Sequence, residues 1–452
     1  MQPESRTWSR LRRSVRRYSS VSTGRFRRPR GETPRGLKPA SQATPSRSVV
    51  TAAVVLFIAA WGVPQLFHYN RPWLIGDIKI YAQYGNLTIA HEVPYRDFSV
   101  EYPPGALPVF VGPILARKWV GYHGFFATWF RILIAICGSV AILGMALCLR
   151  ALRAPPERFR AALVFAALAP VLLGVIISTR YDYWPAMLTV LALAALLWER
   201  DTLAFAALAA GAAAKIYPAV LLPIATVDVA RRRGWRHVGL CLAVFTAVLA
   251  AAFLPFFALA PHGLWRSFYT QQASRPLEIE SLPAGLLLVL KQLVGLRLHH
   301  VTSHGSDNLV GSAPRALAGV DALLQLAALV AVWTIYARGH GGKERLVLAS
   351  AAAVTAFIAF DKVFSPQYLV WLMVLVPLVR GRSGLVASAI LTVMLALTQA
   401  YYPWLFDNLT HHWDPLASWL IFVRNVLVLA LLAVLVRPLI LDRGSPKPVP
   451  AG

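Results

Sequence analysis

The chain has 452 residues, of which 57% are hydrophobic and only 14% are charged. This composition excludes an ordinary soluble domain, in which about a quarter of the residues are charged. Apolar runs of roughly 20 residues recur along the sequence, and a helix of that length crosses the hydrocarbon core of a bilayer. The sequence therefore predicts an all-α fold, a multi-pass transmembrane helical bundle.

The N-terminal segment 1–47 is strongly basic. It holds 13 Lys and Arg residues against two acids, Glu4 and Glu32, and is rich in Ser, Pro and Gly. This composition predicts a disordered tail. A basic tail can bind nucleic acid, but beside a membrane span the positive-inside rule and contact with membrane lipid explain it better. We therefore predict a cytoplasmic tail with no nucleic-acid partner and no signal peptide, because the first apolar run is late and long.

The apolar runs that follow predict about ten spans. They lie at residues 48–68, 123–148, 160–178, 184–198, 237–259, 314–337, 346–361, 363–380, 385–405 and 416–436. Residues 104–120 are then expected not to span, and 202–229 to form a re-entrant hairpin or a pair of short helices. With this topology the basic connections all face the cytoplasm, as the positive-inside rule requires. One transmembrane domain, 48–440, is followed by a cytoplasmic tail, 441–452.

Nearly all carboxylates outside the basic connections and the two tails fall on the predicted extracytoplasmic side. This side receives residues 76–104, 179–184, 260–313, the turn at Asp361-Lys362, and 406–415. Within the outer loop, 281–296 is expected to be an interfacial or re-entrant helix. A transporter more often carries ionisable groups at mid-membrane, in broken helices of repeated halves. Because Arg131, Arg424 and Asn425 are the notable polar residues inside spans, the pattern favours an enzyme over a lipid-linked sugar transporter or flippase.

The first outer loop begins with Asp77, directly after the first span. Ile80, Tyr84 and Leu87 follow at helical spacing and predict a short amphipathic helix with Asp77 near its N-terminus. An aspartate at this place can serve simply as a helix cap. The loop ends in Glu101-Tyr102-Pro103-Pro104-Gly105, where the prolines fit either a turn or a helix start.

Five motifs occur in the order typical of one known family. They are Asp77, Tyr81, Pro94-Tyr95 and Tyr102-Pro103-Pro104; Arg180-Tyr181-Asp182 with Pro185-Ala186; Lys215-Ile216-Tyr217-Pro218 with Leu222-Pro223; RPLEIES at 275–281; and FSPQYLVW at 364–371. From about residue 50 to about 440, the chain resembles glycosyltransferase family 87, whose members are integral membrane enzymes with the GT-C fold.

This resemblance implies sugar transfer on the extracytoplasmic face of the cell membrane. The donor would be a polyprenyl-phosphate sugar, in the first place mannose, and the acceptor a hydroxyl of a lipid-linked or cell-envelope glycan. Arabinofuranose is the alternative sugar. The acceptor hydroxyl loses its proton as it attacks, so a carboxylate must serve as general base. The resemblance assigns this role to Asp77, and displacement with one base implies inversion.

The leaving phosphate needs cations that stabilise its growing charge. Four candidates stand in the motifs or beside them: Arg180, Lys215, Arg275 and Lys362. Two alternatives remain open, because Lys215 could snorkel from a helix end and Arg180 could form an interfacial ion pair with Asp182. The candidates for contacts with sugar or acceptor are Tyr81, Tyr95, Tyr102, Asp182, Tyr217, Glu280, Gln367 and Tyr368.

No cofactor and no metal ion are expected. The Asp-Asp pairs with which other GT-C branches bind divalent metal are absent. His299, His300 and His304 form a cluster, but no carboxylate or Cys stands beside them at regular ligand spacing.

Overall fold

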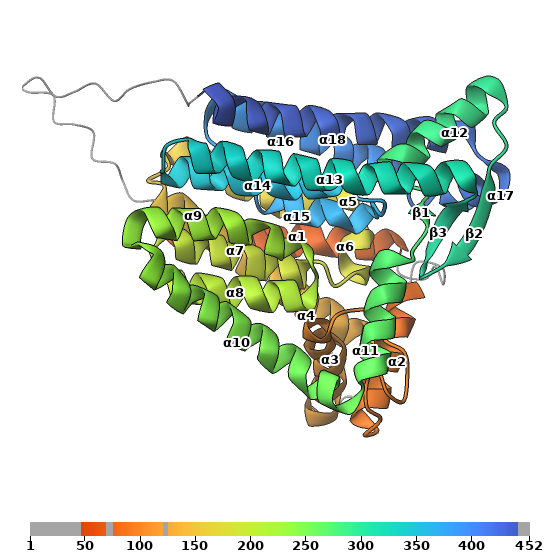
Figure 1. Ribbon diagram of the computed structural model, residues 1–452, viewed down its shortest axis with the longest axis horizontal. Helices are drawn as coiled ribbons and strands as arrows, with labels where there is room; N and C mark the ends of the chain where they lie inside the picture. The colour runs from red at the N-terminus through yellow and green to blue at the C-terminus, as the bar shows by residue number, and fades with distance from the viewer. Residues whose placement is uncertain (1–46, 69–75, 121–124, 442–452) are drawn as a thin grey trace, which may run out of the picture. The chain divides into compact units, whose positions relative to one another are not determined.

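A computed structural model of the protein describes residues 47–68, 76–120 and 125–441. The predicted tails, 1–47 and 441–452, lie outside these residues except for Arg47 and Leu441. The described chain confirms the predicted helical bundle, since helices make up most of it (Figure 1). Helices α13 (Ser312–Arg338), α14 (Lys343–Ala359), α16 (Gly381–Tyr401) and α18 (Pro415–Leu441) pack against one another in this bundle.

Among the described residues, six helices are long and apolar enough to cross a membrane. They are α1 (Arg47–His68), α4 (Phe126–Ala151), α10 (Trp235–Leu259), α13, α16 and α18. Each matches one predicted span. Three other predicted spans correspond to shorter or less apolar helices: α5 (Pro156–Leu173), which ends at Gly174 and is followed by α6 (Ile176–Thr179), α7 (Tyr183–Leu197) and α14. The number of spans therefore stays a prediction.

The span predicted at 363–380 is not one continuous helix. The segment is broken into η5 (Pro366–Tyr368), α15 (Leu369–Met373) and η6 (Val376–Leu378). Pro366 and Pro377 lack an amide N–H, and each is one of the first two residues of a 3₁₀ turn, so each leaves a gap in the helical hydrogen bonding at that point. Side chains of residues 368–379 are buried, as expected for irregular backbone that is surrounded by protein.

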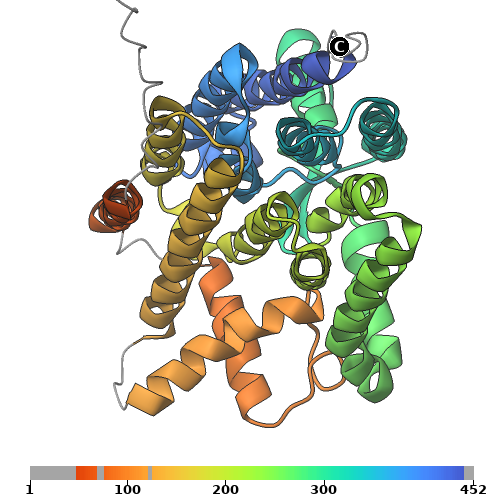
Figure 2. The same cartoon turned by 90° about the vertical axis from the view of Figure 1, so that its left-hand side faces the viewer.

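The segment 202–229 confirms the expected pair of short helices. It folds as α8 (Asp201–Ala214), the 3₁₀ turn η3 (Tyr217–Leu221) and α9 (Leu222–Arg233). Lys215 lies at the break after α8, with extended backbone dihedrals (φ −160°, ψ 139°). Figure 2 shows the same helices turned by 90°. The break presents Lys215 to the interior of the protein.

The first outer loop also folds as expected at both ends. Helix α2 (Gly76–Ile89) carries Asp77 in its first turn. Pro104 begins η2 (Pro104–Ala106), which leads into α3 (Leu107–Val120). Gly105 lies directly against α8, because a Cβ atom there would be 2.5 Å from the carbonyl carbon of Ala213. This close approach fixes the end of the loop beside Lys215.

Gly105→Ala is expected to destabilise the protein by about 1–3 kcal/mol, because the new methyl group has to push η2 away from the α8 backbone. Thermal unfolding of the purified protein in detergent measures the change. Gly62→Ala in α1 is the control, since a Cβ atom at Gly62 would meet nothing within 4 Å. Equal melting temperatures for the two variants would contradict the tight contact.

The long outer loop contains a small sheet that the sequence did not predict. Helix α11 (Pro261–Phe268) and the π-helical turn η4 (Tyr269–Ala273) precede β1 (Leu277–Glu278). After α12 (Leu282–Val294) come β2 (His299–Ser303) and β3 (Ser306–Val310), and the antiparallel order is β1-β3-β2. Helix α12 corresponds to the helix expected at 281–296. Helix α17 (Phe406–His412) follows α16.

Candidate active site

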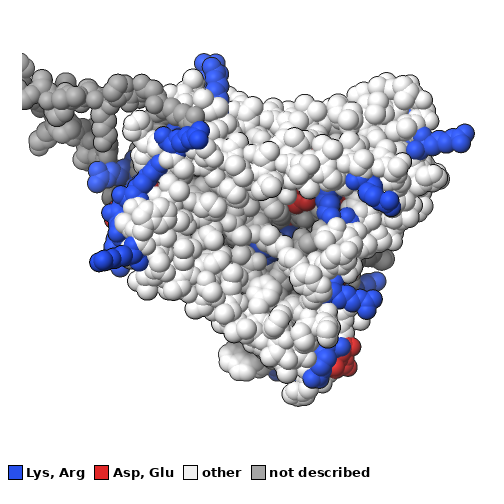
Figure 3. Space-filling view, in the orientation of Figure 1, with Lys and Arg blue, Asp and Glu red and all other residues white. Residues whose placement is uncertain are grey.

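A cavity of about 210 Å³ lies where the outer loops meet the broken helices. Its lining comes from α2, the end of the first outer loop, the breaks at Arg180 and Lys215, residues 275–280, the β2–β3 turn and residues 361–371. Figure 3 shows a hollow in which acidic and basic side chains gather, amid a surface that is largely uncharged. The five motifs therefore converge on one polar cavity.

Asp77 lines this cavity and has a partner outside its own helix. Its Oδ2 lies 2.9 Å from Nε of Arg180, and the hydroxyl of Tyr81 donates to the same oxygen at 3.4 Å. Oδ1 accepts no hydrogen bond from the described residues. The Asp77 side chain is 23% exposed. A helix cap would need neither the ion pair nor the cavity, so the geometry favours a chemical role for this carboxylate.

The proposed ion pair between Arg180 and Asp182 is wrong. Arg180 pairs with Asp77, whereas Asp182 pairs with Lys215 at 2.7 Å (Nζ to Oδ1). Asp182 is only 1% exposed, and Nε1 of Trp371 donates to its Oδ1 at 2.9 Å. Asp182 thus lies beneath the cavity and supports Lys215 from behind.

Lys215 is held at the cavity wall by aromatic rings as well as by charge. Its Nζ lies 5.1, 4.8 and 5.0 Å from the ring centroids of Tyr181, Tyr368 and Trp371, within the range of cation–π attraction. Tyr217 stacks on Trp371 with 3.9 Å between centroids. A snorkelling lysine would extend to the membrane interface, so this enclosed arrangement disfavours that alternative.

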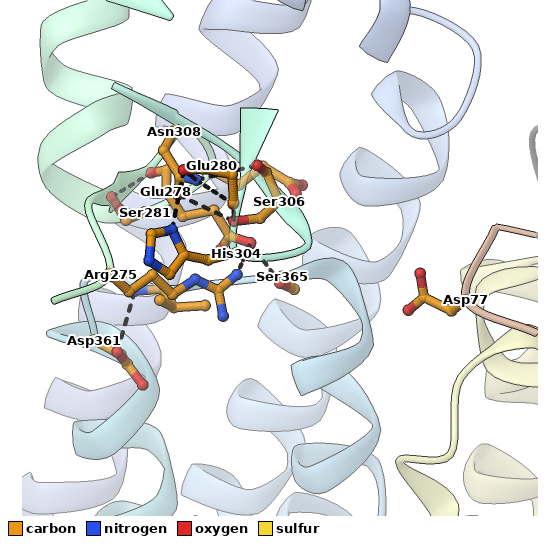
Figure 4. Close-up of polar contacts among 12 residues, drawn as sticks. Asp77, Arg275, Glu278, Glu280, Ser281, His304, Ser306, Asn308, Asp361 and Ser365 are labelled. Carbon is orange, nitrogen blue, oxygen red and sulfur yellow. Dashed lines mark hydrogen bonds and ion pairs between the residues drawn. The ribbon is translucent and has the colours of Figure 1, made fainter. Parts of the chain in front are cut away.

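A second charged group faces Asp77 across the cavity. Figure 4 shows Arg275, Glu278, His304 and Asp361 together, with Asp77 on the other side. Nη2 of Arg275 lies 3.5 Å from Oε1 of Glu278, which also accepts a 2.6 Å hydrogen bond from Ser365. Burial lowers the pKa of His304, and the nearby positive charges of Arg275 and Lys362 lower it further. The lowered pKa favours the neutral imidazole, so Arg275 is the main cation of this group that lines the cavity.

Glu280 lines the cavity, but its carboxyl group is tied to the helical bundle. Tyr401 donates to Oε1 at 2.5 Å, and Nη1 of Arg424 lies 3.8 Å from the same atom. Burial is the main cause that raises the pKa of Glu280 to about 8, and the negative charge of the neighbouring Glu278 adds to it. Arg424 and Asn425 also donate to the backbone carbonyl of Glu280, at 2.5 and 3.1 Å. These two polar residues inside α18 therefore anchor the outer loop, a structural use that a transport path does not require.

The pKa of Glu280 predicts a pH dependence of stability. Between about pH 4.5 and 8 the folded protein keeps a proton on Glu280 that the unfolded chain releases, so the free energy of unfolding falls as pH rises. Glu280→Gln should lessen this fall because an amide does not titrate. Melting temperatures in detergent between about pH 5 and 8 measure it, with Glu92→Gln on the surface as control. A wild-type pH dependence that Glu280→Gln leaves unchanged would contradict the raised pKa.

The remaining predicted site residues divide into two sets. Tyr102, Tyr217, Gln367 and Tyr368 line the cavity. The others lie around it. Tyr81 is buried behind Asp77 and stacks on Phe110 (4.6 Å between centroids), and the Tyr95 hydroxyl donates to the backbone oxygen of Tyr102 at 2.6 Å. Lys362 lines a neighbouring cavity, and its Nζ donates to the backbone oxygen of Ala273 at 3.1 Å.

Several lining residues were missed in the sequence. Glu101 stands directly before the Tyr-Pro-Pro motif, and Trp371 ends the FSPQYLVW motif, so both could have been found there. At the β2–β3 turn, the sequence marked His304 only as a member of a histidine cluster and gave no signal for Gly305. Both residues have positive φ (56° and 66°), as a two-residue hairpin turn requires. Gly305 lies against the Glu101 carboxylate, where a Cβ atom would be 2.8 Å from Oε2.

Comparisons with known proteins bear on part of this chain. A family model described as mannosyltransferase (PIG-M) matches residues 310–438. The matched segment includes Asp361, Gln367 and Tyr368 of the cavity but not Asp77, Arg180 or Lys215. No curated protein sequence matches the chain. Membership of family 87 stays a prediction.

One solved structure is similar to this chain across most of its length. It is the crystal structure of ArnT from Cupriavidus metallidurans bound to undecaprenyl phosphate, with a TM-score of 0.43 and 16% sequence identity. The similarity covers 87% of this chain and 78% of that chain.

Proposed function

We propose that this protein is an integral membrane glycosyltransferase of GT-C type. It moves mannose from a polyprenyl-phosphate donor to a hydroxyl of a lipid-linked or cell-envelope glycan. The observation that carries the proposal is one cavity lined by the carboxylate of Asp77 and by the cations Lys215 and Arg275, with Arg275 on the side opposite Asp77 (Figure 4). The match of residues 310–438 to a mannosyltransferase family supports sugar transfer and favours mannose over arabinofuranose.

Lys215 and Arg275 bind the donor phosphate in this mechanism. As the bond from the anomeric carbon to the phosphate oxygen breaks, the electron pair stays on that oxygen and negative charge grows there. Cations fixed in advance stabilise this charge more in the transition state than in the bound donor. Arg275 can offer two parallel N–H donors and Lys215 a compact charge. Arg180 differs from these two cations because its ion-pair partner is Asp77, the proposed base, and its role is to orient that carboxylate.

Asp77 acts as the general base. The acceptor hydroxyl attacks the anomeric carbon from the face opposite the phosphate. It transfers its proton to Oδ1, the Asp77 oxygen that accepts no hydrogen bond from the described residues. Arg180 and Tyr81 hold Oδ2, so they keep the carboxylate oriented. A single displacement of this kind inverts the configuration at the anomeric carbon.

The proposed site faces the extracytoplasmic side of the cell membrane. Its carboxylates lie at one end of helices whose other ends carry basic connections, among them Arg231, Arg232 and Arg233 at the end of α9. The positive-inside rule favours these connections as the cytoplasmic ones.

Sugar transfer in membranes that express the chain tests the proposal. Labelled polyprenyl-phosphate mannose is expected to label a lipid-extractable or envelope glycan above the level of membranes without the protein. Labelled polyprenyl-phosphate arabinose, tested in parallel, should give no such product. Transfer from the arabinose donor alone would overturn the choice of mannose, and transfer from neither donor would overturn the proposed function.

A further inference from the structure

A separate cavity lies at the far end of the bundle from the proposed active site. Its volume is about 570 Å³, and it lies between the start of α14, the start of α16 and the end of α18. Helix α14 begins here and ends beside Asp361 of the active site. Its 17 residues span about 25 Å at 1.5 Å per residue, so the two cavities are distinct.

Three arginines line this cavity, one from each of the segments that form it: Arg345, Arg380 and Arg437. Neither Arg380 nor Arg437 pairs with a carboxylate among the described residues. Arg345 is 6% exposed, and its Nη2 donates to the backbone oxygen of Ile335 at 2.9 Å, so its position is fixed.

The acid in the lining does not balance the charges of Arg380 and Arg437. Glu344 accepts two hydrogen bonds from Arg158, at 2.6 and 2.9 Å, and this paired geometry neutralises it. Arg380 and Arg437 therefore leave the cavity with an excess of positive charge. Because like charges around one cavity repel each other, a bound anion would stabilise the arrangement.

The rest of the wall is apolar. Leu348, Val379, Pro438 and Leu441 line the same cavity, and Leu441 is 67% exposed. Figure 3 shows other Lys and Arg side chains gathered at this end of the bundle. The positive-inside rule accounts for basic residues in connections, but it does not require them to share a cavity with an apolar wall. A ligand that fits both parts carries a phosphate and an aliphatic chain.

We propose that this cavity binds an anionic phospholipid. The guanidinium groups of Arg380 and Arg437 hold the headgroup phosphate. The first acyl carbons lie along Leu348 and Leu441. Basic cavities between membrane helices are a recognised location for such headgroups. The bound lipid ties together α14, α16 and α18 at the end opposite to the active site.

Lipid-dependent thermal stability of the full-length protein in detergent tests this site. Phosphatidylglycerol is expected to raise the melting temperature by about 2–4 °C at saturation. Phosphatidylcholine and inorganic phosphate at equal concentration should not. Added salt should weaken the effect, because the contact is between exposed charges.

Matched variants locate the effect. Arg380→Gln/Arg437→Gln should lose the response to phosphatidylglycerol, whereas Arg382→Gln, an exposed neighbour outside the lining, should keep it. Arg380→Lys/Arg437→Lys should retain part of it. The proposal fails if the double Gln variant responds like wild type or if phosphatidylcholine gives the same shift. Full stabilisation by inorganic phosphate alone would overturn the lipid as ligand and leave a site for free phosphate.

Discussion

Sugar transfer by the Asp77→Asn variant is expected to fall about 10²–10⁴-fold below that of the wild type, the usual contribution of a positioned general base. Asparagine keeps the size of the side chain and can still accept a hydrogen bond from Tyr81, but it cannot take the proton of the acceptor hydroxyl. Initial rates from labelled polyprenyl-phosphate mannose in expressing membranes, at equal protein level, measure the loss.

Two further measurements separate catalysis from folding. Donor binding by the purified variant should be retained, because Lys215 and Arg275 are unchanged. Asp97→Asn is the matched control: Asp97 is another carboxylate of the same outer loop, ion-paired with Arg96 at 2.9 Å, but it lies outside the cavity. Transfer by Asp77→Asn at the level of Asp97→Asn would reduce Asp77 to an N-terminal residue of α2 with a structural role.

The site residues that belong to sequence motifs could be predicted, but their pairing could not. Arg180 and Asp182 are two positions apart and of opposite charge, which suggests an ion pair. In the structure Arg180 has extended backbone (φ −119°, ψ 150°), whereas Asp182 already has helical dihedrals (φ −63°, ψ −22°). This change of backbone turns the two side chains to different partners. Such a change depends on how α6 and α7 pack, which local sequence does not determine.

The small sheet shows why the outer loop was harder to predict than the helices. Strand β1 has only two residues, and its partner β3 follows in the sequence only after α12 and β2. Strand β2 does not alternate between buried and exposed side chains, so it lacks the period-two pattern that identifies a strand. Helices of 20 or more apolar residues need no distant partner to be recognised. The β2–β3 turn, which carries His304 into the cavity, belongs to a sheet that is completed by the distant strand β1.

The stacked rings beneath the cavity are a second feature that arises only from packing. Tyr217 and Trp371 are 3.9 Å apart between centroids although they come from distant motifs. Both follow a break, at Lys215 and at Pro366, and the sequence placed a break at the first position but a continuous span at the second. Proline identity alone does not decide between a kinked helix and a broken one.

Lys215→Met is expected to destabilise the protein by about 3–5 kcal/mol and to abolish transfer. The loss of stability follows because Asp182, 1% exposed, would keep a buried charge without its cation. Thermal unfolding in detergent and the transfer assay measure the two effects. This single variant does not distinguish a phosphate ligand from a residue that only neutralises Asp182.

The double variant Lys215→Met/Asp182→Asn makes that distinction. A neutral amide in place of the Asp182 carboxylate would still accept the hydrogen bond from Trp371 and would leave no buried charge, so most of the lost stability should return. Transfer should not return, because the leaving phosphate would still lack its cation. If transfer recovered together with stability, Lys215 would serve only to neutralise Asp182, and the donor phosphate would have to be bound by Arg275 without it.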